Sequence, residues 1–383
     1  MSFLMHIVLF LCSINIKYSV GVQNKLGCRD HKNKIVDWYV LYKIPKLSHS
    51  SNPLIRTGSA YMYISNNTVD KGWELSTKDI GDKNSMPGNT LASLYNDKIA
   101  NNLLWILYND DPPNSSVVGK YGHAKGVVAT DKDQGFWMIH SVPNFPPMPN
   151  VGTSSKRRIR TTTLAVDDFS SNSEYSYPSS GYVRGQSFLC ISLKANQFNT
   201  VGRQLMYNQI IVYRKNLPAK LSNQYPDLTN AANQIRFKNP PYSNKEIIKS
   251  STSLEFISFA KSDKWQQDLY SDFVAPQLKS SLFVETYLNG PGKLNSKCQG
   301  LEVHNIKSVK LHTGDVQFTS SQDHSKWVVA IDNKNNKSWV CVGDINRADT
   351  QYYRGGGTVC LNLFHLWKNY RDSVNDVEPC PLH

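Results

Sequence analysis

Short hydrophobic runs separated by polar turns recur along the chain and predict β-strands. They are rich in β-branched and aromatic side chains, and they end at turn-forming residues such as Pro45 and Asn66. The predicted strands span residues 36–42, 59–64, 125–129, 135–140 and 282–287. Polar residues 131–134 separate the third strand from the fourth, so these two are predicted to form a hairpin or to lie side by side.

Two longer segments place apolar residues at helical spacing. In residues 90–106 these positions are Leu91, Leu94, Ile99, Leu103 and Ile106, and Asn89 or Thr90 can cap the helix. In residues 262–278 they are Trp265, Leu269, Phe273 and Val274. Strands that alternate with helices predict a chain of the α/β or mixed α+β class.

Residues 146–180 lack such periodicity and are rich in Pro, Ser, Thr and Asn, which predicts a long surface loop. The loop carries a cationic cluster made of Lys156, Arg157, Arg158 and Arg160. A solvated loop and a contact for a polyanion backbone are equally good interpretations of this cluster.

The composition shows that the chain is strongly basic. The chain has 383 residues, 40% of them apolar, with 43 Lys and Arg against 30 Asp and Glu and a net charge of +13. That length and apolar content suffice for a large core and exclude a disordered, collagen-like or coiled-coil chain. The charge favours an anionic partner, namely nucleic acid, glycan or membrane, and does not choose among them. Outside the N-terminus no apolar run reaches the ~18 residues of a membrane span, which excludes a multi-pass membrane protein.

The N-terminal segment predicts export. Residues 3–14 are apolar, and the small residues Ser19 and Gly21 suit a signal peptidase, so residues 1–21 are interpreted as a cleaved signal peptide; a buried strand is the alternative. Cys12 leaves with this segment. The even set that remains predicts disulfides, with about 15 pairings open. It consists of Cys28, Cys190, Cys298, Cys341, Cys360 and Cys380.

Three sequons fit a glycosylated chain in the secretory pathway, and they begin at Asn66, Asn114 and Asn336.

A repeat carries the candidate chemistry. Residues 123–131 and 324–332 both read His-x-Lys-x-Val-Val-Ala-x-Asp, and a polar turn and a second apolar run follow each, ending at Asn144 and Asn346. On a strand, residues two apart face the same side, so the His and Lys of each unit are expected to project together. Each half of the chain thus supplies one His, one Lys and one Asn.

If the halves pack with pseudo-two-fold symmetry, two imidazoles and two ammonium groups meet at one phosphodiester. One imidazole attacks phosphorus, the other protonates the leaving oxygen, and the lysines and asparagines hold the non-bridging oxygens, so no metal or cofactor is expected. Duplication of an edge strand is the structural alternative, but it does not explain matched polar residues in apolar strands. The chain has no GxSxG, P-loop, HExxH or CxxC motif that would favour another chemistry.

At these residues the sequence resembles the deoxyribonuclease II family, acid endonucleases with a phospholipase D-like fold. The resemblance extends over nearly the whole mature chain. Besides the His-x-Lys units, it includes Val36-Asp37-Trp38-Tyr39, Tyr108-Asn109-Asp110, Gln134-Gly135-Phe136-Trp137, His140-Ser141-Val142-Pro143, Gly202-Arg203-Gln204-Leu205, Phe259-Ala260-Lys261, Asp268-Leu269-Tyr270, Cys341-Val342-Gly343-Asp344 and Arg354-Gly355-Gly356-Gly357.

The resemblance implies roles for particular residues. His123, Lys125, His324 and Lys326 would be catalytic. Apart from the resemblance, Asn144 and Asn346 of the repeat, with Ser141, are expected to bind substrate. The implied disulfides are Cys28 to Cys190, Cys298 to Cys380 and Cys341 to Cys360. Residues 148–172 form an insertion relative to typical members, and Asp131 and Asp332 lie one place beyond the acidic position of the phospholipase D motif.

The expected fold has two pseudo-symmetric phospholipase D-like halves, residues 22–200 and 201–383, each a sheet flanked by helices and sharing one active site. The expected activity is metal-independent cleavage of DNA that leaves 3′-phosphate ends, in a secreted or lysosomal enzyme. DNA is the expected partner, a homodimer stays open, and no membrane contact is expected. A secreted DNA-binding effector with little or no catalysis is the first alternative, and a phospholipase-like enzyme on anionic lipid is the second.

Overall fold

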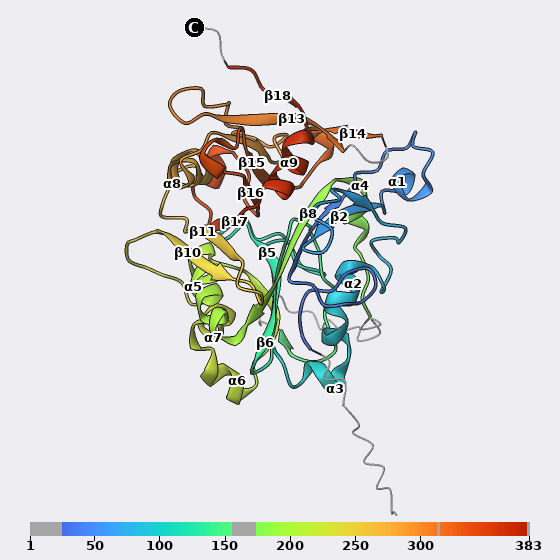
Figure 1. Cartoon of the computed structure of the whole chain (residues 1–383). Coiled ribbons are helices and arrows are strands. Elements are labelled where there is room, and N and C mark those ends of the chain that lie inside the picture. The colour runs from blue at the N-terminus through green and yellow to red at the C-terminus, as the bar shows by residue number, and fades with distance from the viewer. Residues whose placement is uncertain (1–24, 155–173, 312–314, 381–383) are drawn as a thin grey trace, which may run out of the picture.

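The computed structural model describes residues 25–154, 174–311 and 315–380. The signal segment 1–21 and the cluster Lys156, Arg157, Arg158 and Arg160 lie outside these residues. The described chain is built around two large sheets that lie one above the other in Figure 1, with helices at their sides. The mixed α/β class expected from the sequence is confirmed.

The first sheet belongs to the first part of the chain. In spatial order its strands are β3 (Glu74–Leu75), β2 (Tyr61–Ser65), β1 (Trp38–Lys43), β8 (Gln186–Lys194), β6 (Gln134–His140), β5 (Lys125–Thr130), β4 (Leu104–Asn109), β9 (Val212–Asn216) and β7 (Thr153–Ser154). Neighbouring strands are antiparallel throughout, and β5 and β6 form the predicted hairpin, with Val128 opposite Trp137.

The second sheet is built from the second part of the chain. Its strands run in the order β10 (Ser243–Lys249), β11 (Glu255–Lys261), β17 (Gly356–Asn362), β16 (Trp339–Gly343), β15 (Trp327–Ala330), β12 (Leu282–Glu285), β13 (Val303–Leu311) and β14 (Val316–Thr319), and β18 (Val374–Val377) pairs with β13. Only β12 and β13 are parallel among the described pairs of this sheet.

The two sheets repeat one strand order. The series β2-β1-β8-β6-β5-β4 corresponds position by position to β10-β11-β17-β16-β15-β12, so the two His-x-Lys units lie at the start of equivalent strands: Lys125 begins β5, and Lys326 directly precedes β15. One hydrophobic core joins the sheets, because Val40 and Val128 of the first and Val329 and Val359 of the second belong to the same buried cluster. The halves are therefore packed on each other through apolar side chains.

Strand alternation explains the unbroken apolar runs. Val40 of β1 faces the core between the sheets, whereas Tyr39 and Leu41 face a second core with Met86 and Leu94. Because both faces of the strand are buried, apolar and polar residues do not alternate along it, and Lys43 at its end is buried as well.

The helices are short. The α-helices are α1 (Pro53–Thr57), α2 (Met86–Leu91), α3 (Asp97–Ala100), α4 (Ser179–Val183), α5 (Phe198–Asn208), α6 (Ala219–Gln224), α7 (Pro226–Ala232), α8 (Ala275–Leu278) and α9 (Phe364–Asp372). Single turns are η1 (Ala92–Tyr95), η2 (Ala195–Gln197), η4 (Ser320–Gln322), η5 (Lys334–Asn336) and η6 (Asp349–Gln351), and η3 (Leu269–Val274) is a π-helix. Helix α5 packs on β10, β11 and β17, and α9 packs on β15 and β16. In Figure 1, α5, α6 and α7 lie on one side of β6 and α2 and α3 on the other.

The helix predicted over residues 90–106 is wrong. The chain forms α2, η1 and α3 in succession and then enters β4, so the helical part ends at Ala100, Leu103 lies in the connection and Ile106 lies in a strand. The side chains of β4 are buried throughout, and a fully buried strand imitates helical periodicity over a short window. The helix predicted over residues 262–278 shrinks to η3 and α8, because Asp268 caps the π-helix by accepting from Ser271 N at 2.9 Å.

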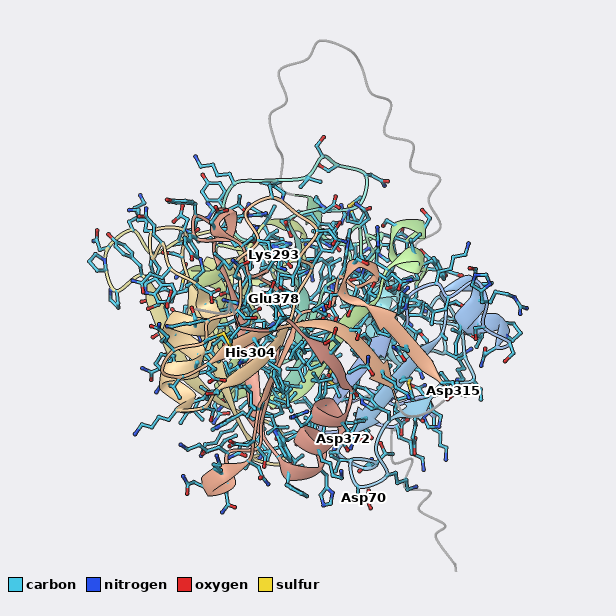
Figure 2. The ribbon with its side chains drawn as sticks, turned by 90° about the horizontal axis from the view of Figure 1, so that it is seen from above. Asp70, Lys293, His304, Asp315, Asp372 and Glu378 are labelled. Carbon is cyan, nitrogen blue, oxygen red and sulfur yellow. A yellow bond between two sulfur atoms is a disulfide. The ribbon has the colours of Figure 1, made fainter. Side chains whose placement is uncertain are left out.

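Three disulfides join the cysteines in the expected pairs, Cys28–Cys190, Cys298–Cys380 and Cys341–Cys360. Near the second bridge the C-terminal segment is fixed by Glu378. Its carboxylate accepts from Lys293 Nζ at 2.7 Å, and Figure 2 shows these two side chains close together. No helix within the described ranges has the length and apolar character needed to cross a membrane.

Candidate active site

The two His-x-Lys units meet where the sheets meet, and they exchange backbone hydrogen bonds between the halves. His123 N donates to Gly355 O at 2.9 Å, and His324 N donates to Gly185 O, also at 2.9 Å. Each histidine therefore takes its place from a glycine of the opposite half. The backbone around Gly355 is also tightly packed, because a Cβ atom at this position would lie 2.4 Å from Asn208 O.

A cavity of about 230 Å³ opens between the two units. Both halves line it, with Asp110, Asp111, Val117, His123, Lys125, Ser141, Pro143, Tyr287, His324, Lys326, Asn346 and Arg354. The four residues expected to be catalytic thus share one cavity, together with Ser141 and Asn346.

On the side of the first half, a buried carboxylate holds the cations together. Asp110 follows β4 and pairs with Lys125 Nζ, with Arg354 Nη2 at 3.1 Å and with His123 Nε2 at 4.0 Å. Burial alone would raise the pKa of Asp110, but Lys125, His123 and Arg354 outweigh it and hold this pKa well below its usual range. Asp110 is therefore ionised at acid pH.

The hydrogen bond on the other side of the His123 ring fixes its tautomer. Nδ1 lies 2.8 Å from Gln351 Oε1, an oxygen that can only accept, so Nδ1 carries the proton. In the neutral ring the lone pair then sits on Nε2, the nitrogen nearest Asp110. Gln351 belongs to the second half, so this contact also crosses between the halves.

The second histidine has different neighbours. The ring of His324 packs edge-on against Tyr287, with 4.3 Å between centroids. Lys326 Nζ donates to His324 O at 2.7 Å, and Lys326 N donates to Ser187 Oγ at 3.1 Å. Tyr287 follows β12 as Asp110 follows β4, so equivalent positions in the repeated strand order hold an aromatic ring and a carboxylate.

Burial and neighbouring cations lower the pKa of both imidazoles. Burial, followed by Lys326 and Arg184, lowers the pKa of His324 to about 3, and burial lowers that of His123 well below its ordinary value. Burial and Lys125 lower the pKa of Lys326 to about 7. Placing positive charge here is costly until an anion arrives, so the cavity is suited to a negatively charged group.

Two buried oxygens lie beside this cavity without partners among the described residues. They are Asp344 Oδ1 and Asn346 Oδ1, at the end of β16. Burial raises the pKa of Asp344 well above its ordinary value, against the opposing effect of Lys125. Asp344 is therefore a neutral acid at acid pH and can donate a hydrogen bond.

The expected substrate-binding residues take different positions. Ser141 lines the cavity, and its Oγ donates to Gln186 Oε1 at 2.5 Å. Asn144 is not among the lining residues. Its Nδ2 donates to Asp111 Oδ1 at 3.1 Å and its Oδ1 accepts from Ser180 Oγ at 3.1 Å, so it holds the loop that carries Asp111.

A second repeat, which sequence reasoning missed, supports the two glycines. Tyr182-Val183-Arg184-Gly185 precedes β8, and Tyr352-Tyr353-Arg354-Gly355 precedes the equivalent strand β17. Comparing the residues before the equivalent strands would have found this Tyr-x-Arg-Gly pattern.

A buried lysine holds each of these turns. Lys43 Nζ donates to Tyr182 O at 2.6 Å, and Lys261 Nζ donates to Tyr352 O at 3.2 Å and Arg354 O at 2.6 Å. Both lysines are almost fully buried, and carbonyl oxygens take the place of counter-ions.

The three sequons differ in the exposure of their asparagines. Asn114 and Asn336 are exposed, whereas Asn66 is half-buried and its Oδ1 accepts from Asp37 N at 2.9 Å.

In the part of the chain that the structure describes, one group of side chains has the spacing of metal ligands, namely Cys298, His304 and Cys380. Both cysteines are in a disulfide, which removes their thiolates as ligands.

Comparison with known proteins gives a consistent result. The family model described as Deoxyribonuclease II matches residues 27–380. Plancitoxin-1 of Acanthaster planci is 37% identical over 364 residues, which cover 94% of each chain. Deoxyribonuclease-2-alpha of Mus musculus is 34% identical over 93% of this chain and 94% of its own, and deoxyribonuclease-2-beta of Homo sapiens is 32% identical over 93% and 92%.

Proposed function

The chain belongs to the deoxyribonuclease II family and is an acid deoxyribonuclease, and from this premise we propose that it cleaves DNA without metal through His123 and His324. The observation that carries the proposal is the convergence of both His-x-Lys units on one cavity. Ammonium and guanidinium groups there supply the positive charge that a metal ion supplies in other nucleases.

The proposed reaction has two displacements. A neutral imidazole attacks phosphorus and forms an N–P bond, the P–O5′ bond breaks, and the opposite imidazolium gives its proton to O5′. The second imidazole, now neutral, takes a proton from water as the water oxygen attacks phosphorus and the N–P bond breaks. Phosphate stays on the 3′ oxygen, and the other fragment ends in a 5′ hydroxyl.

The charged groups of the cavity support both steps of this reaction. Lys125 and Lys326 lie on opposite sides of the site and stabilise the non-bridging oxygens as charge develops on them. The bound phosphodiester also supplies the negative charge that the empty cavity lacks, which favours protonation of one imidazole. This coupling makes the acid range the working range.

The three disulfides support the further proposal that the protein works in the secretory pathway, as a secreted or lysosomal enzyme. DNA is the proposed partner, and the +13 charge of the chain supports attraction to it.

Plasmid nicking at acid pH in excess chelator tests the function. We expect His123→Ala and His324→Ala each to abolish cleavage and the double variant to be little worse than either, because both rings serve one reaction. His365→Ala, which removes an exposed imidazole of α9, is the matched control and keeps full activity. The fragments are expected to carry 5′ hydroxyl ends, so polynucleotide kinase should label them without prior phosphatase treatment.

Each other outcome has a clear meaning. Loss of cleavage in chelator with recovery in magnesium refutes the metal-free mechanism. One histidine variant that keeps most of the rate, with a normal circular dichroism spectrum, refutes the shared site. DNA binding by the wild-type protein without any nicking favours the DNA-binding alternative.

A further inference from the structure

A second cavity, of about 530 Å³, lies next to the candidate active site. Its lining comes from the loop before β5, from β9 and from the segment after α7, and it includes Pro112, Asn114, Val118, Tyr121, Gln234 and Arg236. The loop of residues 110–123 is common to both cavities, because Asp111, Val117 and His123 line the smaller one. Tyr121 is two residues from His123, a span of at most ~7 Å along the chain.

The lining of this groove suits a nucleic acid strand. Of the residues that line it, Arg236 is the one with a formal charge and the remainder are amides, hydroxyls, aromatic rings and apolar groups. Lys120 Nζ also lies 5.1 Å from the centre of the Tyr121 ring. A groove with cations, an aromatic ring and amides offers contacts to phosphate, to base faces and to base edges.

Arg236 is the group most clearly prepared for a ligand. Its guanidinium carbon lies 3.7 Å from the centre of the Tyr121 ring, so the guanidinium group stacks over that ring. The Nε atom is buried and has no hydrogen-bond partner among the described residues. A buried donor without a partner is costly, and an anion or a base edge placed in the groove would satisfy it.

Tyr121 connects this stack to the candidate active site. Its φ of 71° is a left-handed conformation that is uncommon outside glycine, and its carbonyl accepts from Arg354 Nε at 3.2 Å and Gly355 N at 3.3 Å. The same Arg354 pairs with Asp110, and the same Gly355 holds His123. The residues that fix the histidine therefore also fix the ring on which Arg236 stacks.

We propose that the groove beside Tyr121 and Arg236 binds the DNA strand on one side of the scissile phosphate, with Arg236 contacting that strand's backbone. The proposal rests on the deoxyribonuclease activity proposed above. The groove contributes to DNA binding and leaves the chemistry at phosphorus to the smaller cavity.

The test compares two substrates in each variant. Arg236→Gln is measured on plasmid DNA and on bis(p-nitrophenyl) phosphate, a diester too small to reach the groove. We expect KM for DNA to rise about tenfold, as for one lost charge-assisted hydrogen bond. We expect the dependence of log KM on log salt to weaken by ~0.9. Hydrolysis of the small diester stays at the wild-type rate.

Two further variants sharpen the result. Arg236→Lys keeps the charge but loses the flat stack, so it recovers the salt dependence and only part of the affinity. Arg56→Gln is the matched control, because Arg56 is an exposed arginine of α1 that donates to Ser50 O at 3.1 Å and does not line the groove. Its KM for DNA is expected to equal that of the wild type.

The possible failures are distinguishable. An Arg236→Gln enzyme with unchanged KM and salt dependence overturns the groove proposal and leaves the proposed function intact. Equal losses on both substrates also overturn it, because they place the effect of Arg236 at the catalytic centre. A wild-type protein that cleaves neither substrate overturns the proposed function itself.

Discussion

Replacing Asp110 by Asn should change the pH dependence of cleavage more than the affinity for DNA. Asp110 Oδ2 lies 4.0 Å from His123 Nε2, and two unit charges at that distance interact by about 4 kcal/mol at an effective dielectric constant of ~20. That energy is an upper value because Lys125 and Arg354 share the carboxylate. Asp110 raises the pKa of His123 against the effect of burial, so we expect the loss of its charge to lower that pKa further.

The sign of the effect on activity follows from the charge that is lost. A lower pKa for His123 leaves less imidazolium at any given pH, so the limb of the pH–rate profile that reports the titration of His123 moves to lower pH. The cavity meanwhile becomes one unit more positive, so KM for DNA does not rise. A merely structural lesion would lower the rate at every pH without moving the limb.

The assay is plasmid nicking from pH 4 to 8, with kcat and KM measured at each pH. Asp131→Asn is the matched control, because Asp131 lies at the turn between β5 and β6 and accepts from Gln134 N at 2.8 Å. Its profile is expected to match that of the wild type. A profile for Asp110→Asn that coincides with the wild type after normalisation would refute the assigned coupling between Asp110 and His123.

Two further predictions concern stability and DNA affinity. Burial raises the pKa of Glu285 well above its ordinary value. The protonated carboxyl group therefore makes its full contribution to stability below the unfolded pKa of ~4.3. Above that pH this contribution is lost, by ~1.4 kcal/mol per pH unit. Glu285→Gln should flatten this loss between pH 5 and 7 in urea unfolding, and equal slopes would contradict the burial argument. Replacing the cationic cluster at residues 156–160 by Ala should weaken DNA binding and reduce the slope of log affinity against log salt by ~0.9 per lost phosphate contact. An unchanged slope would favour the interpretation of the cluster as part of a solvated loop.

Local pattern was enough to predict much of this fold. The strands around residues 36–42 and 135–140 appear as β1 and β6. The His-x-Lys residues were expected on strands, but only Lys125 lies in one, whereas His123, His324 and Lys326 lie just before β5 and β15. Residues 90–106 show where pattern fails. Their apolar positions fit a helix and a strand buried on both faces equally well, and only the pairing of β4 with β5 and β9 decides between the two.

The sequence predicted those residues of the candidate site that belong to the repeat, but it did not predict the others. Asp110 and Arg354 are separated by 244 residues, yet Arg354 Nη2 donates to Asp110 Oδ2, and no local pattern encodes such a contact. Asn144 and Asn346 occupy matching places in the sequence, but a positive φ of 55° at Asn144 turns its side chain toward the loop of Asp111. Equivalent sequence positions therefore do not guarantee equivalent roles.

The exchange of backbone hydrogen bonds between the halves has a consequence for ancestry. His123 depends on Gly355 and His324 on Gly185, so one half alone would present a histidine without the carbonyl that places it. An ancestor encoding a single half would have built the same arrangement as a two-fold homodimer, in which each subunit completes its neighbour. In this single chain the two histidines have different neighbours, Asp110 beside His123 and Tyr287 beside His324, an asymmetry that an exact two-fold dimer could not have.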